Sequence, residues 1–141
     1  MSLSVIVITK NEERDIRACL ESVKWADEIV VLGGHLDSWD LGTGALDDAT
    51  GVAVSMQVGY LIKRMKLKPK RTIRVVAFMN EENGGAGGRG YFEEYKNDVG
   101  KHFAALESDL GASHPLGFQF AGKAEALPYF APLSRLLASQ G

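Results

Sequence analysis

The sequence has little of what disulfide-bonded, membrane-spanning or nucleic-acid-binding proteins need. Its 141 residues include one cysteine, Cys19, so an internal disulfide is excluded and a thiolate zinc site is disfavoured. No apolar run approaches the roughly 18 residues of a membrane helix, and Leu3 to Ile8 is too short for a signal-peptide core. The formal net charge of -2 gives no basic surface for nucleic acid. We therefore expect a cytoplasmic protein with neither a membrane nor a nucleic acid as partner.

The apolar pattern predicts one α/β domain over residues 1–141. Runs rich in Val, Ile and Leu predict strands over 3–9, 27–32, 71–79 and 103–106, with a fifth at 117–120. Helical spacing follows Asn11 and recurs over 52–65, from Tyr91 and over 124–138, while the glycine-rich segment 84–90 predicts a flexible bend. Alternating strands and helices favour a three-layer α/β/α sandwich with a mostly parallel (mixed) sheet of about five strands.

Charged side chains follow three of the predicted strands, where the chain leaves the sheet. These residues are His35, Asp37, Asp47, Asp48, Glu81, Glu82 and Asp109. Because the carboxyl ends of parallel strands meet at one edge, we expect these groups to lie together there. Taken singly, each has an ordinary interpretation: a loop histidine, a helix N-cap followed by a first-turn acid, or a solvated glutamate pair.

Taken together, one imidazole and several carboxylates would repel without a cation to neutralise them. This donor set, without thiolate, suits Zn²⁺, with Mn²⁺ or Co²⁺ as alternatives. One or two ions could bind, and with two ions a carboxylate could bridge them and the water between them would be acidified.

Three ordered motifs carry a family resemblance. GGHLDSWDLGTGALDDATG (33–51), FMNEENGG (78–85) and LESDLG (106–111) resemble the co-catalytic zinc exopeptidases of the aminopeptidase and carboxypeptidase Q type. The resemblance covers about 27–141 and implies hydrolysis of a terminal peptide bond in a small peptide substrate. Enzymes of this family are often secreted.

The resemblance also implies a role for each residue. His35 and Asp109 would hold one zinc, Asp47 would bridge both, and Glu82 would ligate the second. Glu81 would be the catalytic general base. Asp37 would orient His35 from behind the metal-bound imidazole, and Asp48 would follow Asp47 across a cis peptide.

One ligand of the family pattern lacks a counterpart. The family supplies a further histidine to the zinc of Glu82 from a loop beyond the last residue of this sequence, so we expect weak or absent hydrolysis. His102 precedes a predicted strand and should face the wrong end of the sheet. His114 follows Asp109 and is the better candidate replacement.

The first 32 residues resemble a different family. Residues 1–32 are similar to the opening strand, helix and strand of nucleotide-sugar glycosyltransferases, whereas 33–141 resemble a zinc exopeptidase truncated at its C-terminus. This combination predicts a chimera. The alternative functions are a non-catalytic chimeric or designed scaffold and a residual nucleotide-sugar-binding fragment. Uncovered sheet edges would also allow a homo-oligomer.

Overall fold

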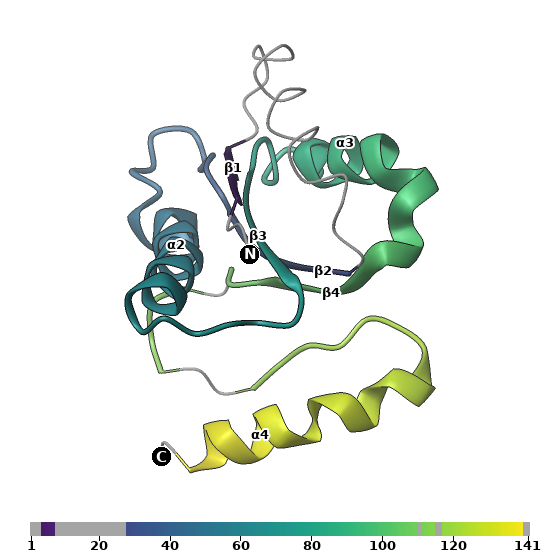
Figure 1. Ribbon diagram of the computed structural model, residues 1–141. Helices are drawn as coiled ribbons and strands as arrows, with labels where there is room; N and C mark the ends of the chain where they lie inside the picture. Colours follow the sequence, from purple (N-terminus) through teal and green to yellow (C-terminus); the bar gives the residue numbers. More distant parts are fainter. Residues whose placement is uncertain (1–3, 8–27, 110, 115–116, 140–141) are drawn as a thin grey trace.

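The computed structural model describes residues 4–7, 28–109, 111–114 and 117–139 of the chain (Figure 1). The helix predicted after Asn11 lies outside these ranges. The strands are β1 (Ser4–Val7), β2 (Ile29–His35), β3 (Thr72–Phe78) and β4 (His102–Glu107). The α-helices are α2 (Thr50–Arg64), α3 (Ala86–Tyr95) and α4 (Ala131–Ala138), and shorter helical turns are η1 (Ala45–Ala49), η2 (Lys96–Lys101) and η3 (Ala124–Phe130).

The strands form one parallel sheet in the order β1-β3-β2-β4. The centre of β3 is Val75, Val76 and Ala77, all buried, as expected of a strand covered on both faces. The α/β class and the parallel sheet predicted from the apolar runs are confirmed. Among the described residues the sheet has four strands, without the mixed pairing and the fifth strand that the pattern predicted.

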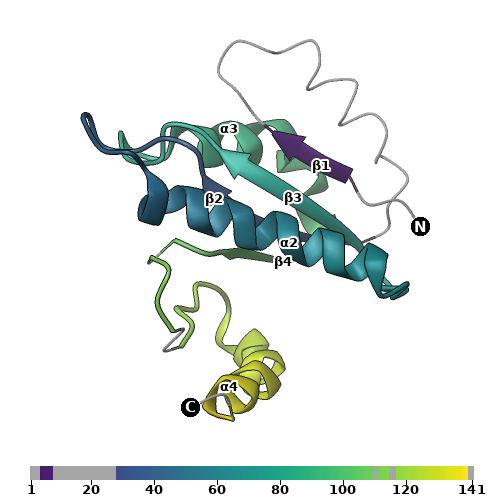
Figure 2. The same ribbon diagram turned by 90° about the vertical axis from the view of Figure 1, so that its left-hand side faces the viewer.

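Helices lie against both faces of this sheet. Figure 2 shows α2 in front of the sheet and α3 behind it. On the α2 side, the Ser55 hydroxyl donates a hydrogen bond of 3.0 Å to the Gly33 carbonyl of β2. On the α3 side, Tyr91 packs edge-on against Phe78, with ring centroids 6.1 Å apart. The two helices therefore cover opposite faces of the same sheet.

Three local predictions were wrong. The segment Gly117–Phe120 contains no strand. Helix α3 already begins at Ala86, inside the expected glycine-rich bend; a side chain at Gly87 would overlap the backbone of Met79, so glycine allows a close approach there. The predicted helix 124–138 is divided into η3 and α4, with Pro128 inside η3. A proline cannot donate the backbone hydrogen bond that a continuous α-helix needs.

The parallel arrangement brings the ends of β2, β3 and β4 to the same edge. His35 is the last residue of β2 and pairs with Phe78, the last residue of β3. Beyond them, the Leu36 amide donates a hydrogen bond of 2.8 Å to the Phe78 carbonyl, and the Ser108 amide donates one of 3.1 Å to Gly33. The three loops that carry the predicted site residues therefore start side by side. No helix in the described part of the chain is long and apolar enough to cross a membrane.

Candidate metal centre

The imidazole of His35 lies at the centre of the acidic edge. The residue is fully buried, with 0% of its surface exposed. Its Nδ1 lies 2.8 Å from the carbonyl oxygen of Asp37; because a carbonyl can only accept, Nδ1 carries the hydrogen. The other nitrogen, Nε2, lies 3.0 Å from Oδ1 of Asp47 and 3.0 Å from Oδ1 of Asp109. The hydrogen bond from Nδ1 to a carbonyl is the arrangement usual for a metal-binding histidine, and it leaves Nε2 facing the two carboxylates.

His35, Asp47 and Asp109 form a cluster of three ligand atoms. One atom from each residue lies within 4.8 Å of the others. The three come from the end of β2, from η1 and from the loop after β4, so only the folded chain assembles them. A divalent cation among these atoms would meet one nitrogen and two carboxylate oxygens, which is a donor set that suits zinc. The structure thus brings together three of the predicted ligands.

Without a cation, a proton takes the central place in this cluster. Burial lowers the pKa of His35, but the hydrogen bond to the Asp37 carbonyl and the charges of Asp109 and Asp48 outweigh it and raise the pKa to about 9. An imidazolium between Asp47 and Asp109 then neutralises part of the acidic charge. A metal ion bound to Nε2 must displace this proton.

Asp48 holds the main chain around the cluster through its buried carboxylate. It is buried, and its carboxylate accepts hydrogen bonds from the His35 amide (3.0 Å) and the Gly51 amide (2.9 Å). Burial raises the pKa of Asp48, and these two amides act in the opposite direction. The Asp47–Asp48 peptide bond is cis, as the family resemblance implied. Asp48 thus ties the end of β2 to the start of α2.

Glycines allow α2 to begin against the sheet. A Cβ at Gly51 would overlap the carbonyl oxygen of Ser108, and one at Gly34 would lie 2.6 Å from the Val52 amide nitrogen. Neither approach leaves room for a side chain. Ser108 immediately precedes Asp109, so the contact at Gly51 also sets how closely Asp109 approaches the rest of the cluster.

The carboxylate of Asp37 has a different partner from the one predicted. Its nearest approach to the His35 ring is 3.8 Å, from Oδ1 to Nδ1, which is too long for a hydrogen bond. Instead Oδ1 accepts a hydrogen bond of 2.9 Å from the Glu81 amide, and Oδ2 accepts one of 3.2 Å from the Glu82 amide. Burial raises the pKa of Asp37, but these two amides outweigh it and hold the pKa below its ordinary value.

Glu82 carries a carboxylate oxygen with no hydrogen-bond partner. Its Oε1 is shielded from solvent and unpaired in the described part of the structure. Desolvation and the nearby charge of Asp47 raise the pKa of Glu82, whereas the charge of His35 opposes the shift. A shielded carboxylate oxygen without a donor is costly, and a cation would satisfy it. Glu82 therefore belongs to the same acidic edge as the His35 cluster.

Comparison with known proteins decides the family. The sequence model of peptidase family M28 matches residues 15–140. The chain belongs to peptidase family M28. Carboxypeptidase Q of Xenopus laevis is 43% identical over 114 residues, which are 81% of this chain and 24% of that protein. Human carboxypeptidase Q is 42% identical over 103 residues, 73% of this chain and 22% of that protein.

A solved M28 structure agrees with the fold. The crystal structure of a peptidase M28 precursor from Shewanella amazonensis matches with a TM-score of 0.63 and 39% identity, covering 82% of this chain and 26% of that one. A probable zinc metalloprotease of Pyrenophora tritici-repentis is 37% identical over 103 residues, 67% of this chain and 23% of that protein. The chain thus spans about a quarter of the length of these relatives.

Family membership confirms the resemblance to zinc exopeptidases. The M28 match begins at residue 15, within the segment 1–32 that we predicted to be glycosyltransferase-like. None of these comparisons supports a glycosyltransferase-like segment or a chimera. Most of segment 1–32 lies outside the described residues, and of it the structure describes β1 and the start of β2.

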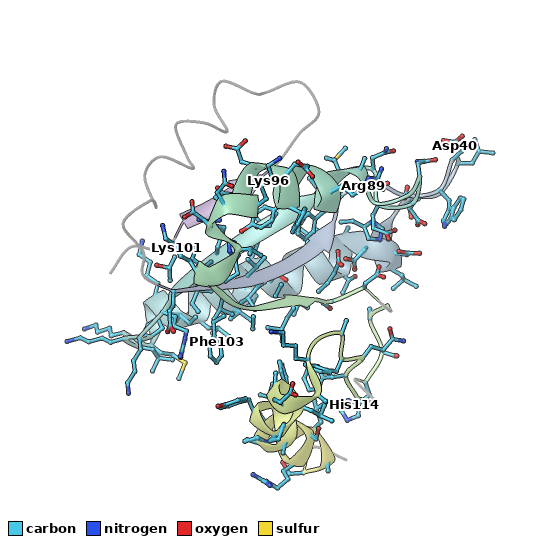
Figure 3. The ribbon with its side chains drawn as sticks, turned by 90° about the vertical axis from the view of Figure 1, so that its right-hand side faces the viewer. Asp40, Arg89, Lys96, Lys101, Phe103 and His114 are labelled. Carbon is cyan, nitrogen blue, oxygen red and sulfur yellow. The ribbon has the colours of Figure 1, made fainter. Side chains whose placement is uncertain are left out.

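Neither remaining histidine joins the cluster of His35, Asp47 and Asp109 in the described structure. His102, the first residue of β4, pairs with the start of β2 at the opposite end of the sheet, as predicted. There its Nε2 accepts a hydrogen bond of 2.8 Å from the Tyr91 hydroxyl. His114 is exposed and lies beside the C-terminal helix, whereas Asp40 and Arg89 mark the site end of the sheet (Figure 3). The cluster of possible ligands found among the described residues contains neither histidine.

Glu107 is a further acid at this edge that was not among the predicted site residues. Glu107 ends β4, two residues before Asp109. Desolvation raises the pKa of Glu107, and the charges of Asp109 and Glu81 raise it further. The available signal was its place in LESDLG, because side chains two residues apart can face the same side of an extended chain.

Proposed function

We propose that this chain is the metal-binding part of a zinc-dependent exopeptidase that hydrolyses a terminal peptide bond of small peptides. The observation that carries the proposal is the direction of His35 Nε2, which lies 3.0 Å from both Asp47 and Asp109 in a chain that belongs to family M28. We expect α2 and α3, on the two faces of the sheet, to form the outer layers of the predicted three-layer sandwich.

The donor set fits zinc. His35, Asp47 and Asp109 would hold one ion, with Mn²⁺ or Co²⁺ as weaker alternatives. Asp47 would bridge to a second ion, which Glu82 would ligate through its unpaired Oε1. When bound, zinc supplies Lewis-acid activation of water and of the scissile carbonyl.

The chain's own residues would supply the rest of the chemistry. Glu81 would take the proton from the attacking water as general base and return it to the leaving amine. Asp48 would keep Asp47 and His35 in place through its bonds to the His35 and Gly51 amides. Since neither His102 nor His114 joins the described site, we expect hydrolysis by this chain alone to be weak or absent.

Thermal unfolding with and without zinc tests this proposal. Zinc at a free concentration 100 times the dissociation constant should stabilise the metal-free chain by about 2.7 kcal/mol. Asp109→Asn should remove most of this gain; the Asp109 side chain is 37% exposed, so the variant should still fold. The exposed Asp40 on the neighbouring loop is the matched control, and Asp40→Asn should keep the gain. No zinc-induced shift, or an equal shift in Asp109→Asn, would overturn the proposal.

The rival proposal is a non-catalytic chimeric or designed scaffold in which the acidic edge has no metal. If no metal binds there, Asp47→Ala should stabilise the chain, because it relieves the repulsion between Asp47 and Glu82. In a scaffold, zinc would change the stability of neither the unmutated chain nor the Asp47→Ala variant. A residual nucleotide-sugar site near residues 9–12 stays a prediction, and titration with uridine diphosphate followed by NMR would test it.

A further inference from the structure

The segment that connects β3 to α3 carries Glu81 and Glu82, and its backbone is held from two sides. From its own side, the Glu81 carbonyl accepts hydrogen bonds from the amides of Gly84 (2.9 Å) and Gly85 (2.8 Å). From the other side, the Glu81 and Glu82 amides donate to the two carboxylate oxygens of Asp37. Asp37 is 44 residues away from Glu81 in sequence, so this contact ties the turn to the loop that follows β2.

The same residue reaches His35 through a different group. Nδ1 of His35 donates to the main-chain carbonyl of Asp37 at 2.8 Å, while the carboxylate remains 3.8 Å from that nitrogen. The orientation of the imidazole therefore depends on the path of the backbone after β2. The path itself is fixed by the bond from the Leu36 amide to the Phe78 carbonyl. The carboxylate is left to bind the glutamate turn.

We propose that Asp37 is a positioning residue for the Glu81–Glu82 turn: its carboxylate places the two glutamates, and its main-chain carbonyl alone orients His35. This inference rests on the proposed function, in which Glu81 and Glu82 act on water and on a metal ion. A carboxylate bonded to the imidazole would affect both the orientation of His35 and the position of the glutamates. Here the carboxylate of Asp37 affects only the glutamates. Removing the carboxylate should release the glutamates and leave the His35 cluster intact.

Asp37→Asn is the first variant for a test. The asparagine oxygen can accept from one amide, but its NH₂ group then faces the other N–H. We expect hydrogen exchange of the Glu81 and Glu82 amides, followed by NMR, to accelerate at least about tenfold, which corresponds to one lost hydrogen bond of about 1.4 kcal/mol. Amides elsewhere in β3 should keep their protection. Exchange that is unchanged at both glutamates would overturn the inference.

Metal binding supplies the second readout. Zinc affinity of the intact chain, measured by calorimetry, should change less than about threefold in Asp37→Asn, and the visible spectrum of bound Co²⁺ should stay the same. A carboxylate that acted through the histidine would instead make its removal cost about 10- to 100-fold in affinity. A loss of that size would overturn the inference. Asp40→Asn is the control for removing one negative charge from the same loop.

Asp37→Glu covers the case in which the asparagine variant does not fold. It keeps the charge but displaces the carboxylate by one methylene, so the glutamate amides should lose protection while zinc affinity is kept. Equal loss of protection throughout β2 and β3 would indicate a purely structural role and contradict the proposal. If the unmutated chain binds no zinc, the proposed function fails, and the exchange measurement still decides the role of Asp37.

Discussion

His35 and His102 stand at opposite ends of the sheet and share one feature. In each ring Nδ1 donates to a main-chain carbonyl, that of Asp37 for His35 and that of Asp98 for His102. The groups around Nε2 differ completely. His35 meets two carboxylates, whereas His102 accepts from the Tyr91 hydroxyl, which itself accepts from the buried guanidinium of Arg74 at 2.7 Å.

The two environments shift the pKa values of the two histidines in opposite directions. Acidic neighbours raise the pKa of His35 to about 9 despite its burial. Burial lowers the pKa of His102, and the charge of Arg74 lowers it further. A fixed Nδ1 is therefore common to the histidine that we propose as a metal ligand and to His102, and the two rings differ in what surrounds Nε2.

Gly51→Ala should have the largest effect on this comparison. The new methyl group would overlap the Ser108 carbonyl, and relief of the overlap should cost on the order of 3 kcal/mol of folding free energy and separate Asp109 from His35. Urea unfolding measures the cost. The control is Gly88→Ala in α3, which meets no described atom within 4 Å and should stabilise the chain by up to about 1 kcal/mol. Equal stability of the two variants would contradict the packing argument.

The pH dependence of the metal-free chain should distinguish the two histidines. The folded-state pKa of His35 is raised, so its stabilisation is complete below about pH 6.5, the unfolded value, and is lost as the pH rises through about 9. The folded-state pKa of His102 is lowered, so its contribution is complete above about pH 6.5 and is lost as the pH falls.

Unfolding in a chelator between about pH 5 and 9.5 provides the measurement. The stability difference between the unmutated chain and His35→Gln should shrink as the pH rises, and the difference from His102→Gln should shrink as it falls. Parallel curves for the two variants would show that the two environments do not differ as described.

Glu82→Gln should have the smallest effect. In the metal-free chain the variant removes a negative charge that lies near Asp47 and Glu81, so the free energy of unfolding should rise slightly. Zinc binding at the His35 cluster should stay near that of the unmutated chain. Chemical unfolding in a chelator and zinc calorimetry measure the two effects. Destabilisation by Glu82→Gln would indicate that Oε1 has a donor after all.

Much of the fold could be read from the sequence because buried parallel strands need little beyond β-branched residues. The runs before His35 and before Met79 predicted β2 and β3 to within three residues at each end. Helix α3 could not be located correctly, because its glycines have low helix propensity and their use depends on the close approach to Met79.

The sequence predicted which residues lie at the site better than it predicted how their side chains are oriented. The ends of parallel strands placed His35, Asp47 and Asp109 together, and the structure confirms that proximity. The direction of the Asp37 carboxylate could not be predicted, since it depends on how the turn at Glu81 meets the end of β2. The spacing of His35 and Asp37 predicts that the two residues lie close together. It does not predict that the His35 ring bonds to the main-chain oxygen of Asp37 and not to its carboxylate.

The most direct test of the account is to locate zinc in crystals of the chain by anomalous diffraction. The account predicts a peak about 2.0 to 2.2 Å from His35 Nε2 and from one oxygen each of Asp47 and Asp109. A peak at His102 or His114, or no peak at the acidic edge in saturating zinc, would contradict it.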